Sequence, residues 1–540
     1  MTTKAITFPL NPLAPLGLNS QSQGTILEPG WARIANNFIY GSTGELEVRE
    51  GSQYLHTTAF STLGTDIVLR DMYDYVDPST GTSYIVGTIH TGGASSPTGK
   101  KLFQITSGVV SNISSTAHTG SYYIPNQFTT FNGKCIGLAG GYFIVKSGSG
   151  NFADVSLTGT AQPSTASYAM LSAFGRLWAI DGDDLKYSDL LDETAWNSSY
   201  DLSEYWGTGD DTGTALAEFN GHLVVFGKNN ILVYDASQGP DSLVKVETIS
   251  GVGCIARDSV QRVGDDIWFL SHGGLMSLSR TIIQKSMPVN AISKNVNDAI
   301  IDAIELIVAT PSNLINTGII NGTYCPLKNL YILAIDTDGS GNSSGGIYAF
   351  DTRTRFEDGS YRVTTWSGSF STSCLERGTG RLLLGGTRVV AGTYTAGVMY
   401  YGGYGGDYRV YSVGTGGTAT SFDLATPWLD LSFIDSGLST RTKILKTLSA
   451  LIYCDDSITE SGTPLIYLQW ATDFSNNDSA SLWTEKTSFT ALDIDSYSKY
   501  RTPTNGSGKY ISFSILGTGI LNLVRLNSLN VQLKIGKDVV

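Results

Sequence analysis

The chain has 540 residues, of which only 15% are charged, and it contains 62 Gly, 28 Tyr and 9 Trp. This composition favours turns and packed sheets over helices, so it predicts an all-β protein. The formal net charge of −13 argues against a surface that coats nucleic acid, because phosphate contacts need Lys and Arg.

Residues 1–30 are rich in Pro, Asn, Gln and Ser and are predicted to form an extended arm. A turn at residue 44 and an alternating strand up to residue 51 follow. By themselves these residues indicate an edge strand that closes a larger sheet structure, with Trp31 and Phe38 as core anchors.

Four segments further along the chain share one pattern of strand, turn and strand. They align when Phe131, Phe174, Phe219 and Val263 are placed in one column, with a step of 43 to 45 residues. That spacing is typical of the blades of a β-propeller. The clearest copy is residues 251–280, where glycine corners separate three short apolar strands.

Three further segments extend the series. Residues 72–105 form a longer first blade, and residues 327–366 and 375–401 form two weaker ones. The sequence therefore predicts a propeller over residues 31–401 with about seven blades, where six to eight are compatible with the pattern.

One stretch inside the propeller has helical rather than strand periodicity. Apolar residues recur at steps of three and four from Ile292 to Val308, and Pro311 stops the pattern. We expect one inserted amphipathic helix near 292–308, which either covers part of its own domain or docks onto a neighbour.

The pattern changes again near the C-terminus. Residues 402–417 are rich in Gly and are predicted to be a linker. Residues 418–540 contain six longer strands separated by polar loops, which predicts a β-sandwich.

A strongly acidic segment runs from residue 181 to residue 218, where Lys186 is the only cation. It is either a solvated loop face or a surface that faces a DNA channel, where like charge would keep a duplex from sticking to the wall. Its eleven carboxylates are those of Asp181, Asp183, Asp184, Asp189, Asp192, Glu193, Asp201, Glu204, Asp210, Asp211 and Glu218.

The sequence offers few candidate residues for catalysis or metal binding. The five cysteines occur singly, the five histidines lack metal-ligand spacing, and residues 336–342 begin like a calcium loop without its closing carboxylate. Pairs of neighbouring aspartates could supply an acid and a base for glycoside hydrolysis, but they stand beside glycines at turns. We expect no catalytic residues, no metal, no cofactor and no enzyme activity. With no signal peptide or long apolar run, we also expect no membrane insertion.

Several motifs resemble the β-propeller proteins that form the tail nozzle, or tail hub, of short-tailed bacteriophages. Besides the propeller repeats, the likeness rests on the C-terminal stretches 510–515 and 526–531 and on an N-terminal motif. That motif consists of Pro29, Gly30, Trp31, Asn36, Asn37, Phe38, Gly44, Leu46, Arg49 and Gly51.

The resemblance implies a structural protein of the virion, assembled in the host cytoplasm. It implies a ring of six copies that is attached to an adaptor ring below the portal, contacts tail fibres or spikes, and surrounds the path along which genomic DNA leaves without sequence-specific binding. The alternative is a glycan-binding or glycan-cleaving propeller that recognises the host surface, in which the tyrosines of residues 400–408 would stack on sugars.

Overall fold

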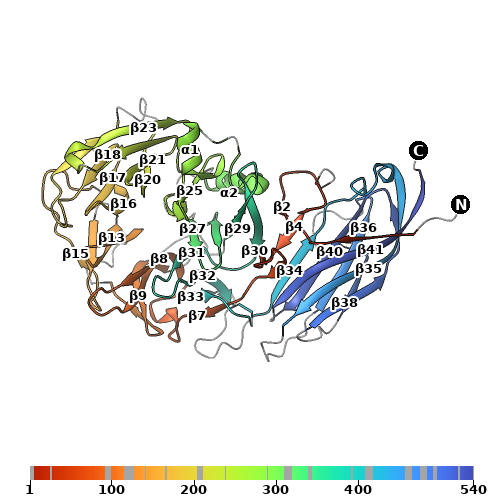
Figure 1. Ribbon diagram of the computed structural model, residues 1–540. Coiled ribbons are helices and arrows are strands. Elements are labelled where there is room, and N and C mark those ends of the chain that lie inside the picture. The colour runs from red at the N-terminus through yellow and green to blue at the C-terminus, as the bar shows by residue number, and fades with distance from the viewer. Residues whose placement is uncertain are drawn as a thin grey trace.

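The computed structural model shows an elongated molecule with a ring of sheets at one end and a second group of strands at the other (Figure 1). The described residues are 5–24, 27–91, 99–114, 127–139, 142–164, 167–203, 211–237, 239–286, 288, 290–308, 319–338, 343–390, 393–404, 406–407, 418–455, 465–474, 483, 485–489, 496–520 and 523–538. None of the helices in these ranges is long and apolar enough to cross a membrane.

Six antiparallel groups of four strands are the blades of a β-propeller; five of them are separate sheets, and the remaining one is one end of a larger sheet. The first two consist of β8 (Val68–Val76), β9 (Ser83–Thr91), β10 (Gly99–Thr106) and β11 (Val109–Asn112), and of β12 (Gln127–Phe131), β13 (Lys134–Ala139), β14 (Tyr142–Lys146) and β15 (Ala153–Asp154). The next two consist of β16 (Ser167–Ala173), β17 (Arg176–Asp181), β18 (Asp184–Tyr187) and β19 (Ser198–Asp201), and of β20 (Gly213–Phe219), β21 (His222–Gly227), β22 (Asn230–Asp235) and β23 (Val244–Ser250). The last two consist of β27 (Ile319–Cys325), β28 (Leu330–Asp336), β29 (Gly346–Arg355) and β30 (Tyr361–Trp366), and of β31 (Thr372–Leu375), β32 (Leu382–Val390), β33 (Thr393–Tyr401) and β7 (Ser52–Tyr54).

The turns that the sequence pattern placed between first and second strands have the expected geometry. In the turns Asn132-Gly133 and Asn220-Gly221 both residues have positive φ. Such pairs match the right-handed twist of the flanking strands in two-residue hairpins. The repeat in the sequence is therefore a repeat of hairpins.

Residues 251–280, the clearest predicted blade, differ in structure from the other blades. They form three strands, β24 (Gln261–Val263), β25 (Asp266–Ser271) and β26 (Gly274–Ser277), and then the helix α1 (Leu278–Gln284) instead of a fourth strand. Ser277 ends the strand and caps the helix, because its hydroxyl accepts a hydrogen bond from the backbone N–H of Arg280 at 3.2 Å. Among the described residues the propeller thus has six four-stranded blades and one three-stranded sheet, rather than seven equal units.

The expected inserted helix is present but shorter, and it is not the only one. A 3-10 turn, η5 (Lys294–Val296), leads into α2 (Asn297–Val308), so the helix begins five residues later than predicted. Its apolar side, with Ile300, Ile304 and Ile307, is buried in the protein's own core. The helix therefore covers its own domain, whereas α1 had no predicted counterpart.

An N-terminal strand closes the ring. β7 pairs antiparallel with β33 and supplies the outer strand of the last blade. The ring of His56 fixes this segment, since Nδ1 lies 2.9 Å from the carbonyl oxygen of Thr58 and Nε2 accepts the backbone N–H of Val398 at 3.2 Å. Burial lowers the pKa of His56 to about 4, so the imidazole is neutral as this pattern requires. The strand expected to close the sheet structure was residues 44–51, but β6 (Leu46–Val48) lies in another sheet, and the closing strand is residues 52–54.

Two larger sheets build the other end of the molecule. The β27–β30 blade continues through β4 (Ile34–Asn36), β34 (Thr420–Ala425), β40 (Ile511–Ile520), β36 (Leu465–Thr472) and β37 (Glu485–Phe489) into one nine-stranded sheet. A seven-stranded sheet contains β38 (Ser496–Pro503), β35 (Arg441–Cys454), β41 (Val524–Asp538), β6 (Leu46–Val48), β5 (Phe38–Tyr40), β1 (Ala5–Leu10) and β39 (Ser507–Gly508). Both sheets share one hydrophobic core, which includes Leu448 of β35 and Leu468 of β36.

The remaining short elements lie at connections. The strands β2 (Gly17–Leu18) and β3 (Trp31–Ala32) pair in parallel, and the 3-10 turns are η1 (Phe60–Thr62), η3 (Pro240–Ser242), η4 (Arg257–Ser259) and η6 (Ser436–Leu438). The segment predicted as an extended arm thus contributes β1, which pairs along its whole length with β41.

Candidate functional site

The bore of the propeller is bridged by side chains. The first strand of each blade lies nearest the axis, and η4 enters the bore just before β24. From η4 the guanidinium of Arg257 donates to the carbonyl oxygen of Tyr168 on β16 at 2.7 Å and lies 5.1 Å from the centre of its ring. The same guanidinium forms a two-armed pair with Asp258, at 2.7 and 2.9 Å.

A third element reaches this contact from the first blade. Burial raises the pKa of Asp71, on β8, well above its ordinary value, and the nearby carboxylate of Asp258 raises it further, against the attraction of Arg257. Burial alone would lower the pKa of Arg257, but the Asp258 carboxylate outweighs burial and raises it. Groups from β8, β16 and η4 therefore lie near one another inside the ring of blades.

The N-terminal motif forms the junction between the propeller and the C-terminal strands. Asn37, Arg49, Ser367 and Asp407 are its core and are called the Arg49 junction below. Arg49 is buried, and its guanidinium donates to both carboxylate oxygens of Asp407, at 3.0 and 2.6 Å, and to the carbonyl oxygen of Ser367 at 2.8 Å. Its Nε donates to the side-chain oxygen of Asn37 at 2.9 Å.

Asn37 connects this guanidinium to both parts of the molecule. It is fully buried with φ of +63°, a conformation that Asn tolerates better than most residues. Its amide nitrogen donates to the hydroxyl of Ser367, just after β30, and to the carbonyl oxygen of Ser421 on β34, at 2.5 and 2.6 Å. The Arg49 junction therefore links a propeller blade to a strand of the C-terminal part through Asn37 and Arg49, two motif residues that are hydrogen-bonded to each other.

Glycines complete the junction. The N–H of Gly51 donates to Gly403 at 2.9 Å, and the N–H of Gly402 donates back to Gly51 at 3.0 Å. A Cβ on Gly51 would lie 1.9 Å from the carbonyl oxygen of Gly406, so only glycine fits this crossing of two chains. The first residues of the run that was predicted as a linker thus pack against the N-terminal motif.

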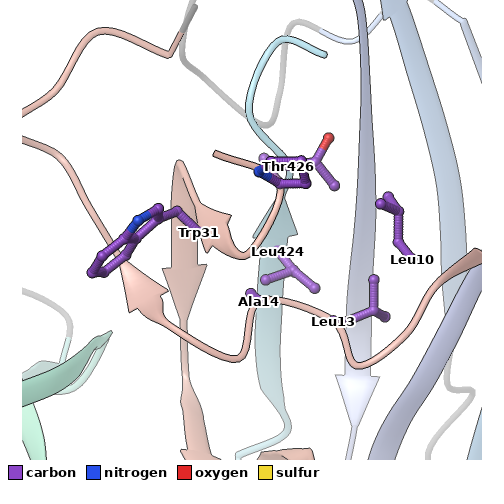
Figure 2. A pocket seen from close by; sticks show the side chains of 8 residues that line it. Leu10, Leu13, Ala14, Trp31, Leu424 and Thr426 are labelled. Atoms are coloured by element: carbon purple, nitrogen blue, oxygen red, sulfur yellow. The ribbon is translucent and has the colours of Figure 1, made fainter. Parts of the chain in front are cut away.

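Other motif residues are structural in different ways. Phe38 is fully buried and lies 5.2 Å from the ring of Phe422, as expected for a core anchor, whereas Trp31 is only half-buried. Trp31, Leu10, Leu13, Ala14, Leu424 and Thr426 surround a small apolar hollow of about 10 Å³ beside β34 (Figure 2). That volume holds about one water molecule, so the hollow is a packing defect and no ligand site.

The acidic segment is divided between the two faces of the propeller. We call the face that carries the turns between second and third strands the 2–3 face, and the opposite one the 1–2 face. By strand topology, Asp181, Asp183, Asp184, Asp201 and Asp211 lie on the 2–3 face, and Asp189, Asp192, Glu193 and Glu218 lie on the 1–2 face. Glu204 and Asp210 lie outside the described residues.

Several of these carboxylates have structural partners. Asp181 pairs with Lys186 and accepts from the backbone N–H of Ser164 at 2.9 Å; burial raises its pKa, but these bonds outweigh burial and lower it. Asp211 accepts the backbone N–H groups of Lys228 and Asn229, at 2.6 and 3.0 Å, and so organises a turn.

Three further carboxylates, those of Asp183, Asp184 and Asp201, gather at one corner, and of these Asp201 accepts a hydrogen bond from the backbone N–H of Ser203 at 2.8 Å. Asp183 is exposed, and Asp184 on β18 stands directly opposite Asp201 on β19. Burial raises the pKa of Asp184, and the neighbouring carboxylates of Asp201, Asp181 and Asp183 raise it further against Lys186. Like charges in directly opposed positions of a sheet are destabilising. Among the described residues, negative charge therefore gathers at one corner of this blade, with Lys186 as the nearby cation; whether this corner faces DNA stays a prediction.

Some of the groups considered for glycan chemistry have structural roles. Asp266, from one of the neighbouring aspartate pairs, accepts from the hydroxyl of Ser277 and from the N–H of Ser279, at 2.5 and 2.9 Å, and so holds the start of α1. Tyr401 is buried and stacks on Trp366 with ring centres 5.0 Å apart. The hydroxyl of Tyr400 bonds to Gln53. Tyr408 lies outside the described residues.

A larger open hollow of about 440 Å³ lies beside α1. It is lined by Arg280, Ile283, Gln284, Asn290, Arg355, Glu357 and Asp358. Burial would raise the pKa of Asp358, but the ammonium of Lys294 and the bonds from Ser360 outweigh it and lower the pKa to about 2. A carboxyl that stays ionised in this way is unsuited to act as a general acid.

One protein-family model matches part of the chain. The family described as bacteriophage P22 Gp10, β-propeller, matches residues 87–311, from β9 to just beyond α2. The match covers most of the first blade, all of the second, third and fourth blades, the three-stranded sheet and both helices, but less than half of the chain. No curated protein matches the chain.

Solved structures share only a distant likeness. Two crystal structures of an extracellular domain from B. thetaiotaomicron, described as a one-component and a hybrid two-component system, have TM-scores of 0.42 and 0.41 at 12% and 11% identity. Each comparison covers 90% of this chain and 62% or 61% of the other, so the chain spans less than two thirds of these proteins. A Bacteroides uniformis protein described as a 6-phosphogluconolactonase has a TM-score of 0.30 at 12% identity, over 55% of this chain and 83% of the other.

The likeness to a bacteriophage propeller family and the all-β propeller fold together indicate a structural component of a phage particle.

Proposed function

We propose that the chain is a nozzle or hub subunit of a short phage tail, and that several copies form a ring around the path of DNA exit. The observation that carries the proposal is the match of residues 87–311 to the P22 Gp10 propeller family. In this function the ring has six copies, joins the portal and its adaptor to the tail fibres or spikes, and acts without enzymatic chemistry.

Because side chains bridge the bore of the propeller, we propose that DNA passes between the copies of the ring rather than through a single propeller. Arg257 and Tyr168 are in direct contact inside the ring of blades. Each propeller would therefore act as a solid wall element, and the inner surface of the ring would be built from the outsides of several propellers.

The Arg49 junction supports a mechanical role. A wall element under the pressure of DNA passage must not hinge between its two parts. The nine-stranded sheet joins a blade to the C-terminal strands through one residue pair, Thr365 of β30 with Asn36 of β4, and Arg49 and Asn37 reinforce this join. We propose that the molecule moves as one rigid body.

Two finer features belong to the same proposal. We take the three-stranded sheet β24–β26 as the seventh blade of the ring, with α1 where an outer strand would lie. We also take the two sheets that share the C-terminal core as a sandwich that extends the subunit away from the propeller.

The proposal is tested by tagging the chain in a phage that encodes it and purifying the particles. We expect the tag to remain in the purified particles and an amber mutant in the gene to yield DNA-filled heads that lose their DNA or fail to infect. Intact infectivity without the chain would contradict a nozzle or hub. Glycan binding on an array, or release of reducing sugars, would instead support recognition of the host surface.

A further inference from the structure

We propose that the outer face of the seven-stranded sheet docks onto the acidic corner of the β16–β19 blade of a second copy of this chain. The inference rests on the proposed ring and names the surfaces that build it. The basic sheet face is defined by Lys446, Lys499, Arg501 and Lys534, and the acidic corner by Asp183, Asp184 and Asp201.

The basic sheet face is a local excess of cations in a protein with a net charge of −13. Its side chains stand on β38, β35 and β41, which are adjacent in the sheet. Lys499 pairs in register with Leu451, and Arg501 with Ser449, on the side opposite the buried Ala450 and Tyr500. Lys534 alternates with the buried Leu533 and Ile535, so it also faces outward.

These cations form no ion pair with another described residue. Among the ion pairs of the described residues none involves Lys446, Lys499, Arg501 or Lys534. Arg525, at the margin of the same sheet, shows the contrast, because it pairs with Glu47 at 2.5 Å. Within the part of the chain that the structure describes, no carboxylate neutralises these four charges, and we infer that a partner does.

Apolar groups between the cations favour a protein as that partner. Tyr497 is 56% exposed, and its ring centre lies 5.2 Å from that of Tyr453 on the neighbouring strand. Half-exposed Leu451 and Ile444 lie on the same face. Aromatic and aliphatic side chains surrounded by charge are typical of protein interfaces, whereas nucleic-acid surfaces are more uniformly polar.

The acidic corner has the complementary chemistry. The carboxylates of Asp184 and Asp201 oppose each other across β18 and β19, Asp183 is exposed beside them, and the nearby Lys186 is already paired with Asp181. Positive charge from outside the chain would relieve this repulsion. A neighbouring basic sheet face supplies such charge.

The two surfaces lie at opposite ends of the elongated molecule, β18 in the propeller and β38 at the far side of the C-terminal sheets (Figure 1). They cannot neutralise each other within one chain. A contact between unlike surfaces of identical subunits is heterologous, and such contacts generate rings when the rotation between subunits closes. The arrangement thus predicts a head-to-tail ring.

Charge reversal and rescue test the inference on the full chain. We expect the double substitution Lys499→Glu and Arg501→Glu to weaken self-association about tenfold to a hundredfold in sedimentation velocity. The reciprocal pair Asp184→Lys and Asp201→Lys should weaken it similarly. A mixture of the two variants should associate again. Arg262→Glu, at another exposed arginine on a strand, is the matched control and should leave association unchanged.

Zero-length carbodiimide cross-linking of a mixture of ¹⁴N- and ¹⁵N-labelled protein locates the contact directly. We expect mixed-label cross-links between Lys446, Lys499 or Lys534 and the carboxylates of the acidic corner. Assembly that survives both charge reversals, with cross-links elsewhere, would overturn this interface but leave the ring intact. A chain that neither self-associates nor occurs as a ring in particles would overturn both. Normal assembly with lost duplex binding in the Lys499→Glu, Arg501→Glu variant would make the face a nucleic-acid surface instead.

Discussion

The guanidinium of Arg49 donates two hydrogen bonds, of 3.0 and 2.6 Å, to the carboxylate of Asp407, which lies 358 residues away in the sequence. Arg49 belongs to the N-terminal motif, and Asp407 belongs to a glycine-rich run that separates the last blade from the C-terminal strands. This pair, together with Asn37, connects the propeller with the C-terminal strands.

Replacing Arg49 by Lys keeps the charge but removes the planar fork that reaches Asp407, Asn37 and Ser367 together. We expect Arg49→Lys to lower the free energy of unfolding by about 3 kcal/mol, since it leaves buried polar groups without partners. Urea unfolding followed by fluorescence measures the loss. The control is Arg262→Lys at an exposed position, and equal stability of the two variants would contradict a role for the junction.

Gly51 should be intolerant of any side chain, because a Cβ there would lie 1.9 Å from the carbonyl oxygen of Gly406. We expect Gly51→Ala to destabilise by about 1–3 kcal/mol, as overpacking does elsewhere, and to increase proteolysis near residues 402–407. Gly378, whose Cβ would meet nothing within 4 Å, provides the matched control. Gly378→Ala should be neutral, and a neutral Gly51→Ala would show that the two backbones do not cross so closely in solution.

Asp423 on β34 gives the core a pH dependence. Burial raises its pKa from 3.8 to about 6, against the hydrogen bond from Ser514 and the charge of Arg33. Below pH 4 both folded and unfolded states are protonated. Between pH 4 and 6 the unfolded state ionises first, so the stability contributed by Asp423 falls as the pH rises, and above pH 6 the loss is complete.

The predicted penalty is at most about 3 kcal/mol. We therefore expect Asp423→Asn to gain stability relative to the unsubstituted chain as the pH increases from 4 to 7, with a constant difference above that. Thermal unfolding at closely spaced pH values measures the difference. The exposed Asp201, whose pKa is lowered by its bonds to Ser203, serves as control: Asp201→Asn should not gain stability over this range. Parallel pH profiles for Asp423→Asn and the unsubstituted chain would refute the prediction.

The bridge across the propeller bore should behave as a coupled unit. We expect Arg257→Met to destabilise by about 1–3 kcal/mol, because it removes the charged hydrogen bond to the carbonyl oxygen of Tyr168 and takes the partner from the half-exposed carboxylate of Asp258. Removing the charge of Asp258 as well, in Arg257→Met with Asp258→Asn, should recover part of the loss. A double-mutant cycle from urea unfolding gives the coupling energy. Strictly additive effects would mean that Arg257 and Asp258 act independently.

Repeats and local turns could be predicted from the sequence because they depend on neighbours. The Asn-Gly corners, the hairpin period and the approximate position of α2 follow from local chemistry and periodicity. The helix α1 was missed since Leu278, Ile282 and Ile283 are equally compatible with a strand, and Ser277 decides the outcome as a cap. This difference turned the clearest predicted blade into the three-stranded sheet.

Long-range pairings could not be predicted in the same way. No local signal links Arg49 with Asp407 or places Arg257 beside Tyr168, because these contacts arise only when the ring closes. The N-terminal motif drew attention through a family resemblance, but its structural meaning depends on which strands flank it. The acidic segment was recognised as a run of charge, yet the alternation of turns divides it between two faces of the propeller.

Electron cryo-microscopy of purified phage particles that carry the chain tests the central claim most directly. The account predicts a ring of copies around the axial DNA path, with sixfold symmetry and with the propeller bore of each copy closed. Copies located only on peripheral fibres, or DNA threaded through a single propeller, would contradict it.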